Sequence, residues 1–263
     1  MNKISTRLLF LSLVIFTAAC RVVPDAGEVI VTADPEFNVD LFEQRSPDDG
    51  LPTFGLWIES LKIYDSSGYE IETKVKIQNQ DIAIQVLSVK KPAIGTGEPG
   101  PATAFVTLGA LANGVYHFSL SLGIPVLSEG TLTVNDGHYE LSIPEPQGVI
   151  FQNMVLERVP ENMIWGYAET PGEAQEPLAD AFILDLKTIT ADPGLAPGFY
   201  GYFTVTGAGG LFFHRSFAPK GPADIFVRRL TASPDALGAL LQSHRSAGQT
   251  SLNIRCLTTF GEK

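Results

Sequence analysis

The sequence predicts an all-β fold, built as one or two Greek-key or immunoglobulin-like β-sandwiches with one short helix near the C-terminus. From Phe54 onward, apolar and polar residues alternate in short runs that end at turn residues, as they do in half-buried strands. Residues 135–137, Asn-Asp-Gly, separate two such runs and tolerate the positive backbone dihedrals of a tight hairpin. A Leu-x-x-Gly-x-Tyr spacing occurs twice, at residues 111–116 and 195–200. Together these observations favour short antiparallel strands.

The alternating runs fall into two groups on either side of Pro171. In the first group, residues 71–77 alternate apolar with charged side chains, as expected of an antiparallel strand with one solvent face. A Gly- and Pro-rich loop at 95–101 interrupts this group. The expected strands are 56–63, 71–77, 82–89, 104–108, 115–122, 131–134 and 138–143, followed by 182–189, 199–206, 211–217, 225–230 and 252–258.

One helix is expected after the strand at 225–230. Ser233 is a suitable N-cap, Pro234 fits the first helical position, and Asp235 favours the positive end of the helix. Four residues then share one face at helical spacing, and Gly248 lies just beyond the expected end. They are Leu237, Leu240, Leu241 and His244. We expect this helix to cover the sheet.

The repeated spacing is similar to the tyrosine corner of Greek-key sandwiches, in which a phenol bonds back to the connecting backbone and clamps the turn. Here the two phenols are those of Tyr116 and Tyr200. Two such corners 84 residues apart suggest two related β units, 54–170 and 171–263. A single sandwich of about 200 residues is the alternative architecture.

The first twenty residues have the pattern of an export signal. Lys3 and Arg7 supply a positive start, and residues 8–16 form an apolar stretch interrupted only by Ser12. That stretch is shorter than the roughly 20 apolar residues of a transmembrane helix. Thr-Ala-Ala-Cys follows at 17–20. Residues 1–19 are therefore expected to be a cleaved signal peptide.

The small residues before Cys20 resemble the lipobox of bacterial lipoproteins. The resemblance implies that the Cys20 thiol receives a diacylglyceride, that the preceding peptide bond is cut, and that the mature chain carries further acyl groups such as palmitate. Arg21 follows the cysteine, and in this family a residue other than aspartate there implies the outer membrane, in either leaflet. The resemblance covers the signal alone and departs from the family pattern at Thr17, where leucine is usual. Ordinary cleavage that leaves Cys20 as a free thiol is the alternative.

Residues 20–53 are expected to form an acidic, flexible tether that holds the folded part off the membrane. The segment carries eight acidic residues and several prolines, and mutual repulsion of the acids favours an extended chain. Two short apolar stretches, 29–31 and 37–42, leave room for one strand that docks on the folded part.

Charge is divided unevenly along the chain. The whole sequence carries a formal net charge of −11, yet residues 211–263 hold seven basic and three acidic residues, a net of +4. Such a segment can mark a face for an anionic partner, for example phosphorylated lipid headgroups, another acidic envelope component or a protein. The candidate binding residues of this segment are Arg215, Lys220 and Arg228. The alternative is that the basic segment and the acidic remainder of the chain neutralise each other within one folded body. Nucleic acid is not an expected partner of an exported chain this acidic.

Few residues in the sequence predict catalysis, and no motif predicts a cofactor or a metal. The chain lacks a Gly-x-Ser-x-Gly, a His-Glu-x-x-His and a Walker-type sequence. We therefore expect a noncatalytic binding or scaffold module, attached to the membrane by its N-terminal lipid. The alternative is an envelope hydrolase or metal-binding protein that uses His117, His138 and Glu140, if their strands are neighbours.

Cys256 has no second cysteine to pair with once Cys20 carries a lipid, so no disulfide is expected. It alternates with Leu252 and Ile254, which predicts a position on the apolar face of a strand. A cysteine there behaves as a small buried hydrophobe.

Overall fold

Strands make up most of the chain that the structure describes, which confirms the prediction of a mainly β protein. The computed structural model describes residues 33–45, 51–93, 97–123, 126–172, 176–214, 217–247 and 252–262. By their contacts these residues belong to one unit, Ala33–Lys263. The predicted signal peptide and lipidation site, Cys20, lie outside the described ranges. The described residues contain no helix long and apolar enough to cross a membrane.

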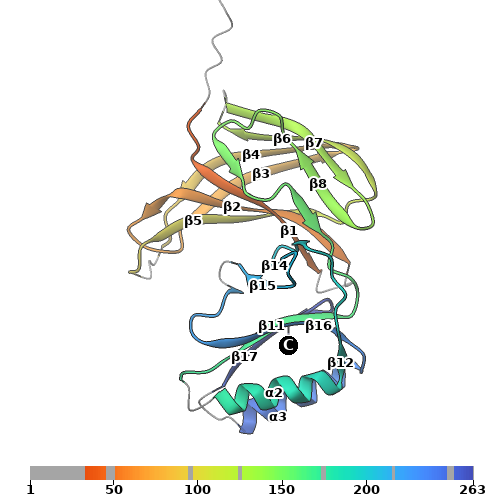
Figure 1. The fold of residues 1–263 in the computed structure, drawn as a ribbon. Helices are drawn as coiled ribbons and strands as arrows, with labels where there is room; N and C mark the ends of the chain where they lie inside the picture. The colour runs from red at the N-terminus through yellow and green to blue at the C-terminus, as the bar shows by residue number, and fades with distance from the viewer. Residues whose placement is uncertain are drawn as a thin grey trace, which may run out of the picture. The chain divides into compact units, whose positions relative to one another are not determined.

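Ten strands form one large, curled sheet (Figure 1), in the order β10-β8-β7-β6-β4-β3-β5-β2-β1-β9. Most neighbours are antiparallel, whereas the pairs β1 with β9, β3 with β5 and β4 with β6 are parallel. The ten strands are β1 (Phe37–Arg45), β2 (Pro52–Tyr64), β3 (Glu70–Gln78), β4 (Asp81–Lys90), β5 (Gly100–Gly109), β6 (Gly114–Leu122), β7 (Val126–Val134), β8 (His138–Ser142), β9 (Val149–Phe151) and β10 (Val155–Glu157).

The two edge strands of this sheet are consecutive in the chain. β9 pairs with β1 and β10 pairs with β8, so the residues between them bridge both edges. The Gln152 amide donates to the Val39 carbonyl at 2.9 Å, and the Leu141 amide donates to the Met154 carbonyl at 2.8 Å. We call residues 149–157 the seam. The seam brings β1 and β8 together, and the curl of the sheet follows from it.

Apolar side chains at every second strand position form the core of the large sheet. On β1, Phe37, Val39 and Leu41 are buried, while the residues between them are only partly covered. On β8, Tyr139 and Leu141 are buried, whereas His138 and Glu140 lie on the other face, as the alternation predicts. The largest fully buried side chains of this core include Phe54, Phe118, Tyr139, Leu41, Leu56 and Ile58.

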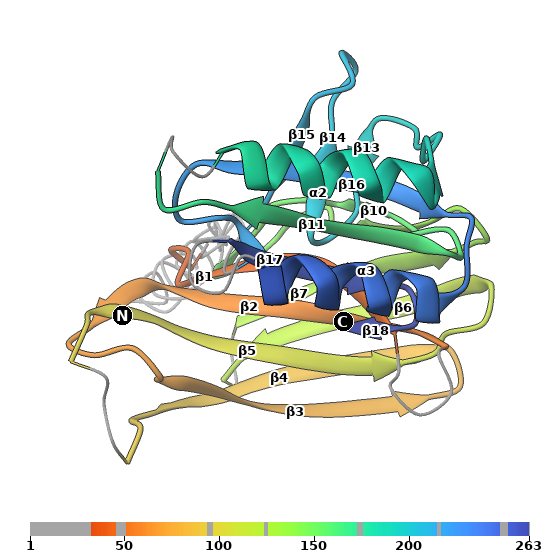
Figure 2. The same ribbon diagram turned by 90° about the horizontal axis from the view of Figure 1, so that it is seen from below.

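A second sheet has five strands in the order β12-β16-β11-β17-β18. Its central strand β11 is buried at its first six positions, because both faces of the sheet are covered. Two helices cover one face, as seen from below in Figure 2, and aromatic side chains of a three-stranded sheet cover the other. The elements are β11 (Met163–Glu169), β12 (Thr190–Ala191), β16 (Ala223–Leu230), β17 (Asn253–Thr258), β18 (Gly261–Glu262), α2 (Glu176–Thr188), α3 (Pro234–Ala247), and the three-stranded β13 (Gly198–Phe199), β14 (Phe203–Val205) and β15 (Leu211–Phe213).

The helices include one that the sequence predicts and one that it does not. α3 begins where predicted, and the Ala236 amide donates to the Ser233 Oγ at 3.2 Å. The prediction of a strand at 182–189 is wrong, because most of this segment lies in α2. Its buried side chains, Ala179, Phe182 and Leu186, follow a helical period of three to four residues. The described chain therefore holds two helices, not the single helix expected.

Tyr202 links the large sheet to the small one. Its ring centroid lies 4.6 Å from that of Phe42 on β1 and 5.3 Å from that of Trp165 on β11. Such edge and tilted contacts are favourable arrangements of aromatic quadrupoles. Phe42 lies in β1, which falls within residues 20–53. β1 pairs along its whole length with β2, so this part of the segment is a strand of the large sheet.

Candidate binding cleft

A cleft of about 640 Å³ lies where four segments of the chain meet. Its walls come from the start of β2, the turn between β7 and β8, the residues after β10 and the loop between β12 and β13. Volumes of about 300–1,000 Å³ are typical of sites for small ligands. The lining residues are Leu51, Pro52, Asp136, Gly137, Arg158, Val159, Pro160, Glu161, Gly194, Leu195, Ala196 and Tyr200.

The turn between β7 and β8 supplies one wall, and it lies where the sequence predicts it, although none of residues 135–137 adopts the expected positive φ. The Asn135 Oδ1 accepts hydrogen bonds from the amides of Gly137 and His138, both at 2.8 Å. This side chain takes over the role of a backbone carbonyl and fixes the turn. The next residue, Asp136, accepts a 2.6 Å hydrogen bond at Oδ1 from the Asn113 Nδ2. Asp136 is thereby held at the rim of the cleft.

Arg158 supplies the positive charge of the cleft. Its backbone amide donates to the Gly137 carbonyl at 2.9 Å, which ties it to the β7–β8 turn. The guanidinium donates from Nε to the Glu43 Oε2 at 3.3 Å and from Nη1 to the Asn135 carbonyl at 3.2 Å. Its Cζ lies 5.2 Å from the centroid of the Tyr139 ring, within reach of a cation–π contact. Three interactions thus fix the side chain, and a fourth fixes its backbone.

Glu43 is the buried partner of this arginine. Its side chain is 3% exposed, against 21% for Arg158. The Tyr139 phenol donates to the same Oε2 at 3.0 Å, and the Phe54 ring stacks on Tyr139 with centroids 4.5 Å apart. A carboxylate removed from water needs such compensation, because its desolvation costs several kcal/mol. The pair therefore places a neutralised arginine beside the cleft.

Tyr200 closes the opposite wall and forms one of the two predicted tyrosine corners. Its phenol donates to the Ala196 carbonyl at 2.9 Å, and Tyr116 does the same to Ala112 at 2.9 Å, so the hydrogen bond expected of each phenol is confirmed. Burial, and after it the negative charge of Glu157, raises the pKa of the Tyr200 phenol. The phenol therefore stays protonated at neutral pH and keeps its hydrogen bond.

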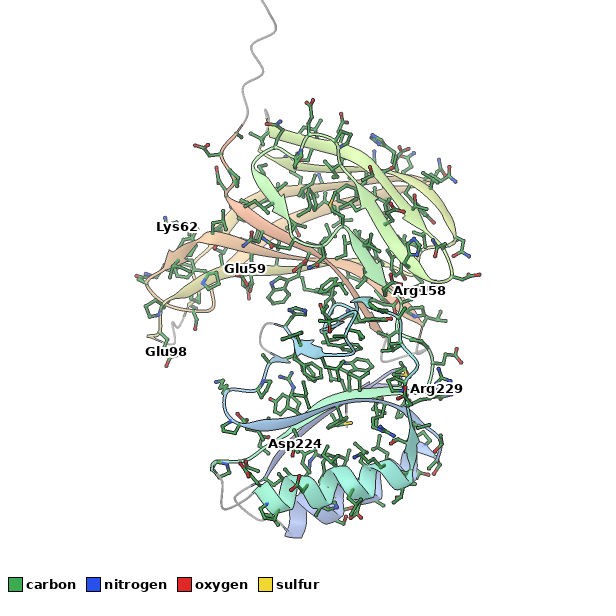
Figure 3. The ribbon with its side chains drawn as sticks, viewed as in Figure 1. Glu59, Lys62, Glu98, Arg158, Asp224 and Arg229 are labelled. Atoms are coloured by element: carbon green, nitrogen blue, oxygen red, sulfur yellow. The ribbon has the colours of Figure 1, made fainter. Side chains whose placement is uncertain are left out.

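A second arginine holds the loop that carries this corner. Arg229 on β16 donates from Nη2 to the Pro193 carbonyl at 3.1 Å, and the Asp192 side chain accepts from the Gly194 amide at 2.9 Å. Figure 3 shows Arg158 and Arg229 on the same side of the molecule. The loop wall is therefore tied to the small sheet, and the turn wall to the large one.

Of the three residues proposed from the basic C-terminal segment, Lys220 and Arg228 lie toward opposite ends of β16. Arg215 lies outside the described residues. Lys220 is exposed, and its backbone amide donates to the Glu169 Oε1 at 2.9 Å near the start of β16. Arg228 lies toward the other end of that strand and donates from Nε to the Thr190 Oγ1 at 2.8 Å. From Ala223 to Arg228 the strand spans about 17 Å, at roughly 3.4 Å per residue.

The histidines of the alternative site are also apart. His117 lies opposite Thr131 of β7, which lies opposite Ser142 of β8, four residues from His138. His117 instead faces Asp81 at 3.5 Å and Glu129 at 3.9 Å. No cluster of three or more His, Cys, Asp or Glu side chains suited to a metal ion occurs among the described residues. Cys256 is fully buried, as predicted.

The cleft was not predicted from the sequence, although one residue in the sequence points to it. Glu43 shares its strand face with Phe37, Val39 and Leu41, so an acid stands where the pattern requires an apolar residue. A charge on a buried face needs a partner. The partner, Arg158, lies 115 residues further along the chain, and no local pattern singles it out.

Comparison with protein-family models, with curated proteins and with solved structures found no match to this chain.

Proposed function

We propose that the protein is a noncatalytic binding module that a lipid on Cys20 holds at the outer membrane. The observation that carries the proposal is the cleft, whose walls come from both sheets and whose arginine is fixed by four contacts. A rigid concave site with a few fixed polar groups suits the recognition of a small ligand. The signal sequence and the lipobox resemblance support the anchor.

The polar groups of the cleft favour binding over chemistry. Arg158 is held by Glu43 and Asn135, and the Tyr200 phenol is held by the Ala196 carbonyl. A general base or nucleophile needs a pKa near the working pH, whereas burial moves the pKa of Tyr200 upward, away from neutrality. These side chains therefore support the shape of the site.

The anchor is tested by fractionation of cells that make the full chain. We expect the unaltered protein in the outer-membrane fraction and a Cys20→Ser variant in the soluble periplasmic fraction. An unaltered protein that appears in the soluble fraction would overturn the anchor.

The cleft is tested on the Cys20→Ser protein with a panel of sugars, amines and short peptides, scored by the rise in melting temperature. Ala196→Trp places a large ring in the cleft, since Ala196 is exposed and lines it. Ala208→Trp is the matched control, because Ala208 is exposed in the turn between β14 and β15. We expect at least one compound to stabilise the parent and the control but not Ala196→Trp. If no compound in the panel gives this result, the cleft is not the binding site.

The basic C-terminal segment is a second candidate surface for an anionic partner. Lys220 favours it, because the Lys220 ammonium is exposed and no described carboxylate pairs with it. Replacing Arg215, Lys220 and Arg228 by alanine should abolish a salt-sensitive interaction with anionic lipid vesicles. Unchanged vesicle binding would remove this surface from consideration.

For the fold, we propose that the two tyrosine corners mark related Greek-key units. The equal 2.9 Å bonds of Tyr116 and Tyr200, each to a carbonyl four residues earlier, support this relation. An experimental structure in which either phenol leaves its carbonyl would contradict it.

A further inference from the structure

We propose that the cleft binds a ligand through a protonated amine, and that this ligand is a short peptide with a free N-terminus. The inference rests on the proposed binding function and adds the chemical class of the ligand. Three charged side chains line the cleft, namely Asp136, Glu161 and Arg158. The arginine is already paired with Glu43, so the two carboxylates set the sign of the charge that a ligand meets.

The two carboxylates have unused capacity. Asp136 receives one described hydrogen bond, at Oδ1, and Glu161 is exposed with no described hydrogen-bond or ion-pair partner. An ionised carboxylate can accept about four hydrogen bonds. An ammonium group offers three donors and a positive charge, and charge-assisted hydrogen bonds are about twice as strong as neutral ones. An anionic ligand would instead meet two negative charges.

Arg158 supplies a complementary feature. Its Nε and Nη1 are engaged, while its Nη2 has no acceptor among the described residues. Because Glu43 balances the charge, the N–H groups of Nη2 suit a neutral acceptor such as a peptide carbonyl. A peptide carries an ammonium and a carbonyl only a few bonds apart. The cleft offers carboxylates and N–H donors in the same cavity.

The apolar lining of the cleft can receive a side chain of the ligand. Pro52, Val159, Pro160 and Leu195 are apolar lining residues that come from three of the four segments around the cleft. Small-ligand sites combine apolar walls with a few oriented polar groups, and this cleft has both. A short peptide fits this combination better than a simple amine, because it also presents an apolar side chain.

The test compares three peptides on the Cys20→Ser protein by calorimetric titration. Trialanine amide has a free amine, N-acetyl-trialanine amide is neutral, and N-acetyl-trialanine is an anion. We expect the free amine to bind at least about tenfold more tightly than either acetylated peptide, since acetylation removes the ammonium. Its affinity should fall above a pH of about 8, where an α-amine loses its proton.

Variants identify the carboxylates. Asp136→Asn and Glu161→Gln should each weaken trialanine amide about three- to tenfold, and both together more. Glu145→Gln is the matched control, because Glu145 is exposed, does not line the cleft, and its loss changes the net charge equally. Equal binding of the acetylated peptides, or equal weakening by the control, would overturn the amine assignment. If another class in the panel binds and Ala196→Trp blocks it, the binding function stands and this inference fails.

Discussion

The carboxylate of Glu43 and the phenol of Tyr139 lie 96 residues apart in the sequence and share a 3.0 Å hydrogen bond in the core of the large sheet. Arg158 reaches the same oxygen at 3.3 Å. β1, β8 and the residue after the seam are therefore joined at one atom. Because the carboxylate is almost wholly buried, its removal leaves the arginine without its charge partner in a poorly solvated place.

Glu43→Ala should accordingly lower the free energy of unfolding by about 2–4 kcal/mol, since breaking a buried pair leaves one charge uncompensated. Urea denaturation followed by tryptophan fluorescence measures the change. Glu145→Ala, at an exposed position, should cost less than about 0.5 kcal/mol. Similar losses in the two variants would mean that the buried pair does not stabilise the sheet.

The two tyrosine corners predict matched effects in different parts of the molecule. Tyr116→Phe and Tyr200→Phe each remove one hydrogen bond to a carbonyl and should each cost about 1 kcal/mol. Tyr64→Phe is the control, because no described residue accepts a hydrogen bond from its phenol. Chemical denaturation of the three variants is the measurement, and a control as costly as the corners would argue against the clamp.

Tyr200 also predicts how stability depends on alkaline pH. Burial and the charge of Glu157 raise its pKa above the ordinary value of 10.0, so the folded protein holds the phenolic proton more tightly than the unfolded chain does. The contribution is fully present below pH 10 and is lost as pH rises through the folded-state pKa. Unfolding free energies measured from about pH 9 to 11 should fall less steeply for Tyr200→Phe than for the parent. Parallel curves would contradict the raised pKa.

Gly166 predicts a steric limit at the centre of the small sheet. A Cβ there would meet the Arg255 carbonyl oxygen and would lie 2.9 Å from the Phe226 Cζ. Gly166→Ala should therefore lower the free energy of unfolding by at least about 2 kcal/mol, because a paired strand must shift. Gly207→Ala is the matched control, since its Cβ meets nothing within 4 Å. The melting temperatures of the two variants are measured by circular dichroism. Equal values would show that the strand accommodates the added Cβ without loss of stability.

The sequence predicted the elements whose signals are local. Alternation placed Tyr139 and Leu141 in the core, and Ser233 marked the start of α3. It failed at α2, because the run Phe182-Ile183-Leu184 is as apolar as a buried strand, while the helical spacing becomes visible only when Ala179 and Leu186 are included.

The cleft could not be predicted in the same way. Its turn at 135–137 was recognised, yet Arg158 and the loop of Tyr200 approach that turn only through strand pairing and the curl of the large sheet. Contacts across 115 residues, such as that between Arg158 and Glu43, leave no periodic trace in the sequence. The site is therefore a product of tertiary structure, whereas the strands that support it are encoded locally.

The place of the seam in the chain allows the large sheet to form first. Every strand of the large sheet lies before residue 158, and the small sheet begins only at Met163. A chain that emerges N-terminus first on the far side of a membrane can thus pair the strands of the first sheet before about a hundred further residues have followed. Phe199 joins that core later, together with the corner of Tyr200. The C-terminal part can therefore dock on strands that are already paired, and the cleft is completed when residues 194–200 reach the turn between β7 and β8.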